Sequence, residues 1–72
     1  MPVKKSTLTR FKHFRNVAKP EFRSHIDQVI KLYENRNISK EKTAENLLRR
    51  LVGPKPQAAV KELVTKHAKN PS

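Results

Sequence analysis

The side chains with the clearest chemistry are lysines and arginines gathered near the N-terminus. Residues 1–19 contain six basic side chains and no acidic one: Lys4, Lys5, Arg10, Lys12, Arg15 and Lys19. Ammonium and guanidinium groups in such a cluster attract phosphates, and binding gains free energy from the counterions that it releases. Solubility alone does not require an acid-free stretch of this length. We therefore expect this segment to supply most of the attraction to a polyanion.

Two smaller basic clusters follow later in the chain. Arg49, Arg50 and Lys55 surround a Gly-Pro break, and Lys61, Lys66 and Lys69 form the third cluster. Each of these clusters is equally typical of a solvated helix face. For the chain as a whole, the net charge of +11 favours binding to a polyanion, which would also relieve the self-repulsion of so basic a domain.

The last predicted helix also carries residues that suit base recognition. Its outward face would present Gln57, Ala58, Lys61 and Thr65. Gln and Lys side chains contact base edges, and Thr reaches bases or phosphates. The predicted nucleic-acid-binding residues are therefore Lys4, Lys5, Arg10, Lys12, Arg15, Lys19, Arg49, Arg50, Lys55, Gln57, Lys61 and Thr65.

Catalytic, metal and cofactor chemistry find no support in the sequence. There is no cysteine, and a single glycine cannot build a phosphate-binding loop. His13, His25 and His67 lack the local spacing of a metal motif. All six acidic residues fall on the expected outer faces of helices, so no catalytic carboxylate pair is predicted. We expect a protein that is not an enzyme and that carries no metal or cofactor.

Helices are the only elements that the apolar periodicity predicts. Pro20, the turn at 35–37 and the break at 53–56 separate the segments. Ser6 and Ser39 are the expected N-caps, Gly53 the expected C-cap, and the last helix runs over about 56–69. The expected apolar stripes are Leu8, Phe11, Phe14 and Ala18; Phe22, Ile26, Val29, Ile30 and Tyr33; Ala44, Leu47, Leu48, Leu51 and Val52; and Ala59, Val60, Leu63, Val64 and His67.

Three local ion pairs are expected on the outer helix faces, because residues four apart are neighbours on a helix. They are Asp27–Lys31, Glu45–Arg49 and Glu62–Lys66. Phe11 and Phe14 lie among basic residues, where they would either stack on bases or complete the core. We favour the core.

These elements predict a small all-α protein, a three- to four-helix bundle of one domain. We expect a basic N-terminal arm or helix at 1–19, a helical core at 20–69 and a polar tail at 70–72. The order of the last three helices is similar to that of helix-turn-helix domains, in which the last helix enters the major groove. The helix before the Gly-Pro break is long for that motif, so a plain bundle is the favoured alternative.

We therefore predict a small helical protein that binds nucleic acid mainly through phosphates, a regulatory or accessory DNA-binding protein, with DNA preferred over RNA. The alternative is a helical protein–protein interaction module, a viral or regulatory accessory domain, that docks an acidic partner. Exposure of Leu8, Phe11 or Phe14 would favour that alternative. A homodimer is compatible with both.

No apolar run is long enough to cross a membrane, so no transmembrane segment is predicted. We expect an intracellular protein, in the cytoplasm or nucleus. The acid-free N-terminus shares its composition with mitochondrial transit peptides, which leaves mitochondrial targeting as an alternative.

Overall fold

The computed structural model of the chain describes residues 4–67. Helices account for its regular structure, and this range contains no strand. The four α-helices are α1 (Lys5–Val17), α2 (Arg23–Glu34), α3 (Glu41–Leu51) and α4 (Pro56–Glu62). The prediction of an all-α bundle is confirmed. The predicted polar tail at 70–72 and Lys69 of the third basic cluster lie outside the described residues.

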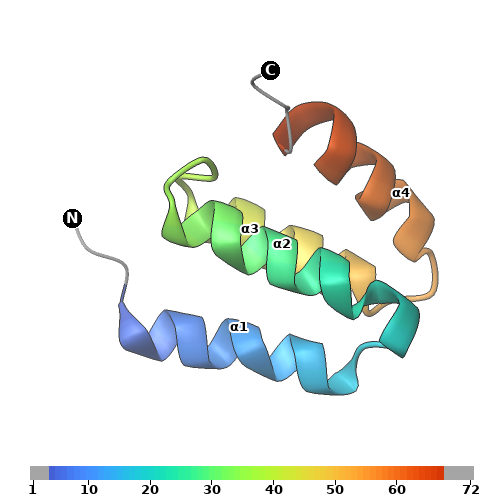
Figure 1. Cartoon of the computed structure of the whole chain (residues 1–72), viewed down its shortest axis with the longest axis horizontal. Coiled ribbons are helices and arrows are strands. Elements are labelled where there is room, and N and C mark those ends of the chain that lie inside the picture. Colours follow the sequence, from blue (N-terminus) through green and yellow to red (C-terminus); the bar gives the residue numbers. More distant parts are fainter. Residues whose placement is uncertain (1–3, 68–72) are drawn as a thin grey trace.

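The helices form a flat bundle. In Figure 1, α1 and α2 run antiparallel, α3 lies behind α2, and α4 crosses at the opposite edge from α1. α1 packs against α2 and α3, whereas α4 packs chiefly against α3. The principal extents are 33 × 31 × 17 Å, and the shortest of them leaves room for about two layers of helices.

One hydrophobic core joins all four helices. It consists of Phe11, Ala18, Ile26, Val29, Ile30, Ile38, Ala44, Leu47, Leu48, Leu51, Ala59 and Leu63. All of these except Ile38 belong to the predicted stripes. The Phe11 ring is 0% exposed and lies 5.3 Å from the ring of Tyr33, between ring centroids. The N-terminal segment therefore contributes a docked helix over residues 5–17.

Both predicted serine caps are wrong. α1 begins at Lys5 with Lys4 as its N-cap, which places Ser6 inside the first turn. α3 has Lys40 as its N-cap, one residue beyond Ser39, and no side chain caps it. The backbone N–H groups of residues 37 and 38 both donate to the Leu32 carbonyl, so these loop bonds cap the end of α2. Ile38 is buried against the core, as expected.

Pro20 opens a short 3₁₀ helix, η1 (Pro20–Phe22), because its fixed φ suits a first helical turn. In the turn at 35–37, Arg36 adopts a φ of 64°, in the left-handed region.

Gly53 ends α3 differently from the prediction. Val52 is the C-cap, and Gly53 has no positive φ. The glycine instead allows a close approach, since a Cβ there would lie 3.2 Å from the Arg49 carbonyl oxygen.

The last predicted helix changes its geometry midway. α4 ends at Glu62, and the chain continues as a π-helix, η2 (Leu63–His67). The Thr65 hydroxyl donates to the Lys61 carbonyl at 2.8 Å, a side-chain bond to residue i−4 of the kind that bends helices. The predicted stripe also extends too far, because Val64 is 54% exposed.

Candidate nucleic-acid interface

The two flanks of α1 each carry an arginine that ties the helix to a neighbour. Phe11 faces the core between these flanks. Arg10 leaves α1 on the side of α3, and Arg15 leaves it on the side of α2. Both arginines belong to the predicted N-terminal cluster. Their pairing inside the protein reduces what they can offer to an external phosphate.

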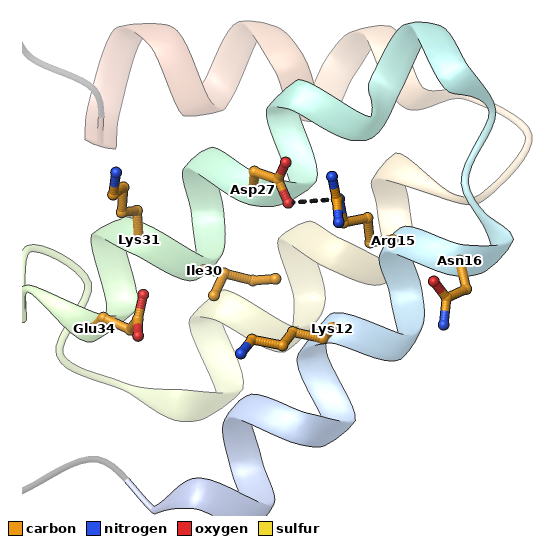
Figure 2. Close-up of a pocket in the computed structure, with 7 residues that line it drawn as sticks. All are labelled: Lys12, Arg15, Asn16, Asp27, Ile30, Lys31 and Glu34. Atoms are coloured by element: carbon orange, nitrogen blue, oxygen red, sulfur yellow. Dashed lines mark ion pairs between the residues drawn. The ribbon is translucent and has the colours of Figure 1, made fainter.

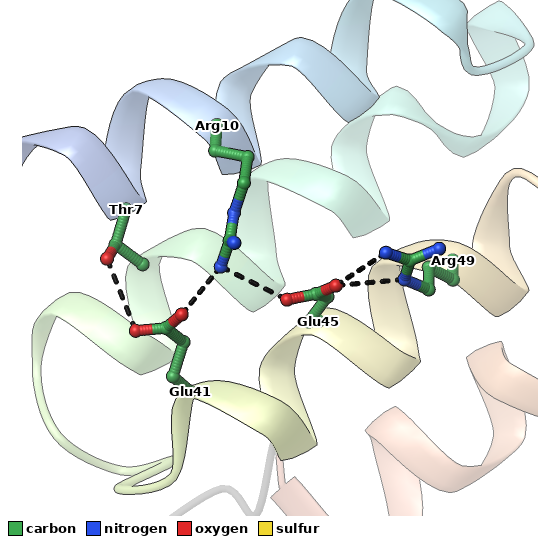
Figure 3. Close-up of polar contacts among 5 residues, drawn as sticks. All are labelled: Thr7, Arg10, Glu41, Glu45 and Arg49. Carbon is green, nitrogen blue, oxygen red and sulfur yellow. Dashed lines mark hydrogen bonds and ion pairs between the residues drawn. The ribbon is translucent and has the colours of Figure 1, made fainter.

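Figure 3 shows a chain of polar contacts between α1 and α3. The Thr7 hydroxyl donates to Glu41 Oε1 at 3.2 Å. Arg10 Nη2 donates to Glu41 Oε2 at 2.6 Å and lies 3.1 Å from Glu45 Oε1. Arg49 then donates to Glu45 Oε2 from Nε at 2.9 Å and from Nη2 at 2.7 Å. The predicted Glu45–Arg49 pair is confirmed, and it forms one end of a network that fixes α1 against α3.

The opposite flank of α1 borders a polar hollow against α2. Arg15 Nε lies 3.0 Å from Asp27 Oδ1 (Figure 2). The predicted Asp27–Lys31 pair is therefore wrong, because a guanidinium from another helix takes the carboxylate. The hollow has a volume of about 420 Å³, and Lys12, Lys31 and Glu34 also line it. Opposite charges share this lining, so it is no simple anion site.

The lysines of the molecule behave differently from these arginines. All ten lysines in residues 4–67 are exposed, and none of them forms an ion pair with another described residue. Of the six arginines, by contrast, Arg10, Arg15, Arg49 and Arg50 each pair with a carboxylate. In the predicted N-terminal cluster, Lys4, Lys5, Lys12 and Lys19 remain exposed to solvent. The uncompensated positive charge of the described chain is therefore concentrated on lysine.

An ion pair joins α3 to α4. Arg50 Nη1 lies 2.8 Å from Glu62 Oε1, and His67 Nε2 lies 4.0 Å from Glu62 Oε2. The predicted Glu62–Lys66 pair is wrong for the same reason as Asp27–Lys31. Local spacing identified a reachable lysine, but an arginine from α3 holds the carboxylate.

The arginines also change the acidity of two carboxyl groups. The hydrogen bonds from Arg49 lower the pKa of Glu45, and the nearby charge of Arg10 acts in the same direction. The hydrogen bond from Arg50 lowers the pKa of Glu62. Partial burial opposes both shifts and is outweighed. Both groups are thus held in the charged form that the guanidinium groups need.

The Gly-Pro break forms a second hollow, which the sequence did not reveal. It has a volume of about 420 Å³ and lies between the end of α3 and the start of α4. Gly53, Pro54 and Ala58 line it together with Arg49, Arg50 and Lys55. The accessible lining is almost wholly apolar, and the three basic residues belong to the second predicted cluster. The cluster was visible in the sequence, but its apolar surroundings depend on the angle between α3 and α4.

The predicted outer face of the last helix is indeed exposed. Gln57, Ala58, Lys61 and Thr65 all face solvent, although the Thr65 hydroxyl already donates to the backbone. This face and the N-terminal lysines do not form one surface, because α1 and α4 lie at opposite edges of the molecule (Figure 1). The predicted site residues therefore divide between two regions, α1 with Lys19, and the α3–α4 turn with α4.

No aromatic side chain in residues 4–67 is fully exposed for stacking on a base. Phe11 is buried, and Phe14, Phe22 and Tyr33 are partly buried against the bundle. Phe11 and Phe14 therefore belong to the core, as favoured. Leu8 is also partly buried, so none of the three residues expected to mark a protein-docking surface stands exposed.

Other chemistry is sparse in the part of the chain that the structure describes. Within residues 4–67, His, Asp and Glu side chains form no group of three that could hold a metal ion. No helix in this range is long and apolar enough to cross a membrane.

No family model, no curated protein and no solved structure matches the chain. Its function has to be inferred from its own residues and their geometry.

Proposed function

We propose that this protein binds nucleic acid through phosphate contacts, without enzymatic activity, and that its lysines make those contacts. The observation that carries the proposal is the division between the two basic residue types. Arginines neutralise four of the six carboxylates, whereas all ten described lysines are exposed and unpaired with described residues. Nucleic acid is a polyanion because its backbone carries phosphates, and such a surface attracts it.

The N-terminal region is the primary contact surface in this proposal. Lys4, Lys5, Lys12 and Lys19 lie on α1 or beside it, and no acidic residue occurs before Glu21. Each lysine that neutralises a duplex phosphate makes the slope of log affinity against log salt concentration more negative by about 0.9. Four such contacts would give a slope of about −3 to −4.

Double-stranded DNA is the preferred ligand in this proposal. Single-stranded binding uses exposed aromatic side chains on which bases stack. The burial of Phe11 and the partial burial of the other aromatic residues remove that platform from the described surface. A duplex needs only cations placed along its phosphate backbone.

Base recognition would require α4 to enter a groove, as the recognition helix of a helix-turn-helix domain does. The exposed Gln57 and Lys61 support such a role. Against it, α4 is only seven residues long before the π-helix begins. We therefore propose phosphate contact as the function. If Gln57→Ala changed the DNA sequence that the protein prefers, α4 would also recognise bases.

The test is fluorescence anisotropy of labelled duplex DNA and single-stranded RNA at several salt concentrations. We expect Lys12→Gln/Lys19→Gln to weaken duplex binding by about tenfold at physiological salt and to reduce the salt slope by about 2. Arg15 stays intact because it holds Asp27.

The matched control is Lys40→Gln/Lys42→Gln, which removes the same charge from exposed lysines outside the predicted site. We expect it to change affinity much less. Equal losses in the two variants would show a general attraction to a +11 protein and would contradict a defined interface.

A further inference from the structure

The hollow at the α3–α4 turn combines features that the phosphate-binding proposal does not use. Gly53, Pro54 and Ala58 supply an apolar lining, and Arg49, Arg50 and Lys55 border it. It opens to solvent beside the exposed face of α4. An apolar hollow bordered by cations suits a ligand that carries an apolar group between anionic ones.

The two arginines at this hollow are already held in place. Arg49 donates hydrogen bonds to Glu45 from Nε and Nη2, and Arg50 donates one to Glu62 from Nη1. Pairing neutralises most of the charge of these arginines, so Lys55, which pairs with no described residue, supplies the net positive charge at the hollow. A guanidinium has five N–H donors, so each arginine keeps N–H groups that can donate hydrogen bonds to a second carboxylate. The Arg49 side chain is 65% exposed despite its pairing. Because the internal carboxylates orient both side chains, a ligand loses less conformational entropy by ordering them.

The chemistry of the lining favours a peptide over a nucleotide. None of the six lining residues is aromatic, so a base would have no ring on which to stack. An aliphatic side chain, in contrast, gains free energy from burial against proline and alanine. Both arginines already bind carboxylates within the protein, which is the group that an acidic peptide presents.

We propose that this hollow docks an acidic peptide segment of a partner protein. An aliphatic side chain of the peptide enters the space between Pro54 and Ala58, and flanking carboxylates pair with Arg49, Arg50 and Lys55. Charge complementarity and the apolar lining together select this occupant. The proposal is separate from phosphate binding by the N-terminal lysines, because no residue of α1 lines the hollow.

The probe is a labelled pentapeptide with a central Leu and two acidic residues on each side, measured by anisotropy at physiological salt. Replacing its Leu by Ser should weaken binding about fivefold, because the hollow then buries no aliphatic group. Replacing the acids by their amides should abolish binding. Equal affinity of the Leu and Ser peptides would overturn the proposal.

Two protein variants test the location. Ala58→Gln fills the hollow without changing the charge, and we expect it to weaken peptide binding about fivefold. Ser24→Gln on the exposed surface of α2 is its size-matched control and should have no effect. Lys55→Gln should also weaken binding, whereas Lys40→Gln should not. Equal effects of the two lysine variants would mean general electrostatic attraction and would overturn the site.

The affinity of the same variants for duplex DNA distinguishes peptide docking from the proposed nucleic-acid binding. Ala58→Gln should leave DNA affinity unchanged while peptide affinity falls, so either proposal can fail alone. The NMR signal of the Ala58 methyl group gives a direct reading of the occupant. A shift on adding the peptide supports the proposal. A shift with single-stranded RNA of similar charge, and none with the peptide, would assign the hollow to nucleic acid and overturn it.

Discussion

The arginine on the α3 flank of α1 and the lysines of the same helix carry the same charge but differ in their contacts. On the flank, Arg10 contacts two glutamates of α3 and holds two helices together. Lys5 is exposed and Lys12 borders the hollow on the α2 side, and neither forms an ion pair with a described carboxylate. The planar guanidinium can serve two carboxylates at once, whereas the compact ammonium group keeps its hydration. A cluster of basic residues in a sequence can therefore contain both cross-links and binding groups.

The largest expected effect comes from removing the anchor between the two flanks. Phe11→Ala deletes a ring that is 0% exposed, and we expect it to lower the free energy of unfolding by about 3–5 kcal/mol. The release of α1 would free Arg10 and Arg15 together. Chemical denaturation followed by circular dichroism measures the loss.

Val17→Ala is the control on the same helix, because Val17 is 61% exposed and its truncation should cost less than about 0.5 kcal/mol. A Phe11 variant no less stable than the Val17 variant would contradict the docking of α1 in the common core.

A smaller effect should separate Arg10 from Lys12, two residues apart on α1. Arg10→Gln leaves the carboxylates of Glu41 and Glu45 without their shared cation. We expect the melting temperature to fall by a few degrees, a modest loss because these groups are substantially exposed. Lys12→Gln makes the same change in charge and should leave the melting temperature unchanged. If both variants melt alike, the arginine network contributes no stability of its own.

The ion pairs also predict a dependence of stability on pH. The pKa values of Glu45 and Glu62 are lowered in the folded state from the ordinary value of 4.5. The unfolded chain therefore binds protons first as the pH falls. The stabilisation is fully present above the unfolded pKa and is lost as the pH drops through the lower, folded pKa.

Thermal melts from about pH 6 to pH 3 should show this loss, a window set by the ordinary and lowered pKa values. Glu45→Gln/Glu62→Gln should be less stable at neutral pH and should have a flatter profile. A double variant with the slope of the original protein would assign the acid sensitivity to other carboxyl groups.

Most of the core could be predicted because helical periodicity records which side of each segment is apolar. Ile26, Val29, Leu47, Leu48 and Leu51 follow directly from that spacing, and all are buried. Helix starts were less predictable. The caps at Ser6 and Ser39 failed because the N-caps of α1 and α3 are Lys4 and Lys40, and neither start uses a side-chain cap.

The arrangement of the charges could not be predicted. Arg10 and Glu41 are 31 residues apart, and no local pattern reports their contact. The same limit explains why Lys31 and Lys66 were expected to pair with acids that Arg15 and Arg50 hold in the folded chain. The exposed face of α4 was predictable, whereas the apolar hollow beside it depends on how α3 and α4 meet.

The most direct test of the division between arginine and lysine is the affinity of two charge-matched variants for the same duplex DNA. Lys12→Gln/Lys19→Gln and Arg10→Gln/Arg15→Gln each remove two positive charges, and both are measured well below their melting temperatures. We expect about a tenfold loss of affinity for the lysine variant and less than about a twofold loss for the arginine variant. The reverse order, or equal losses, would contradict the assignment of phosphate binding to the lysines.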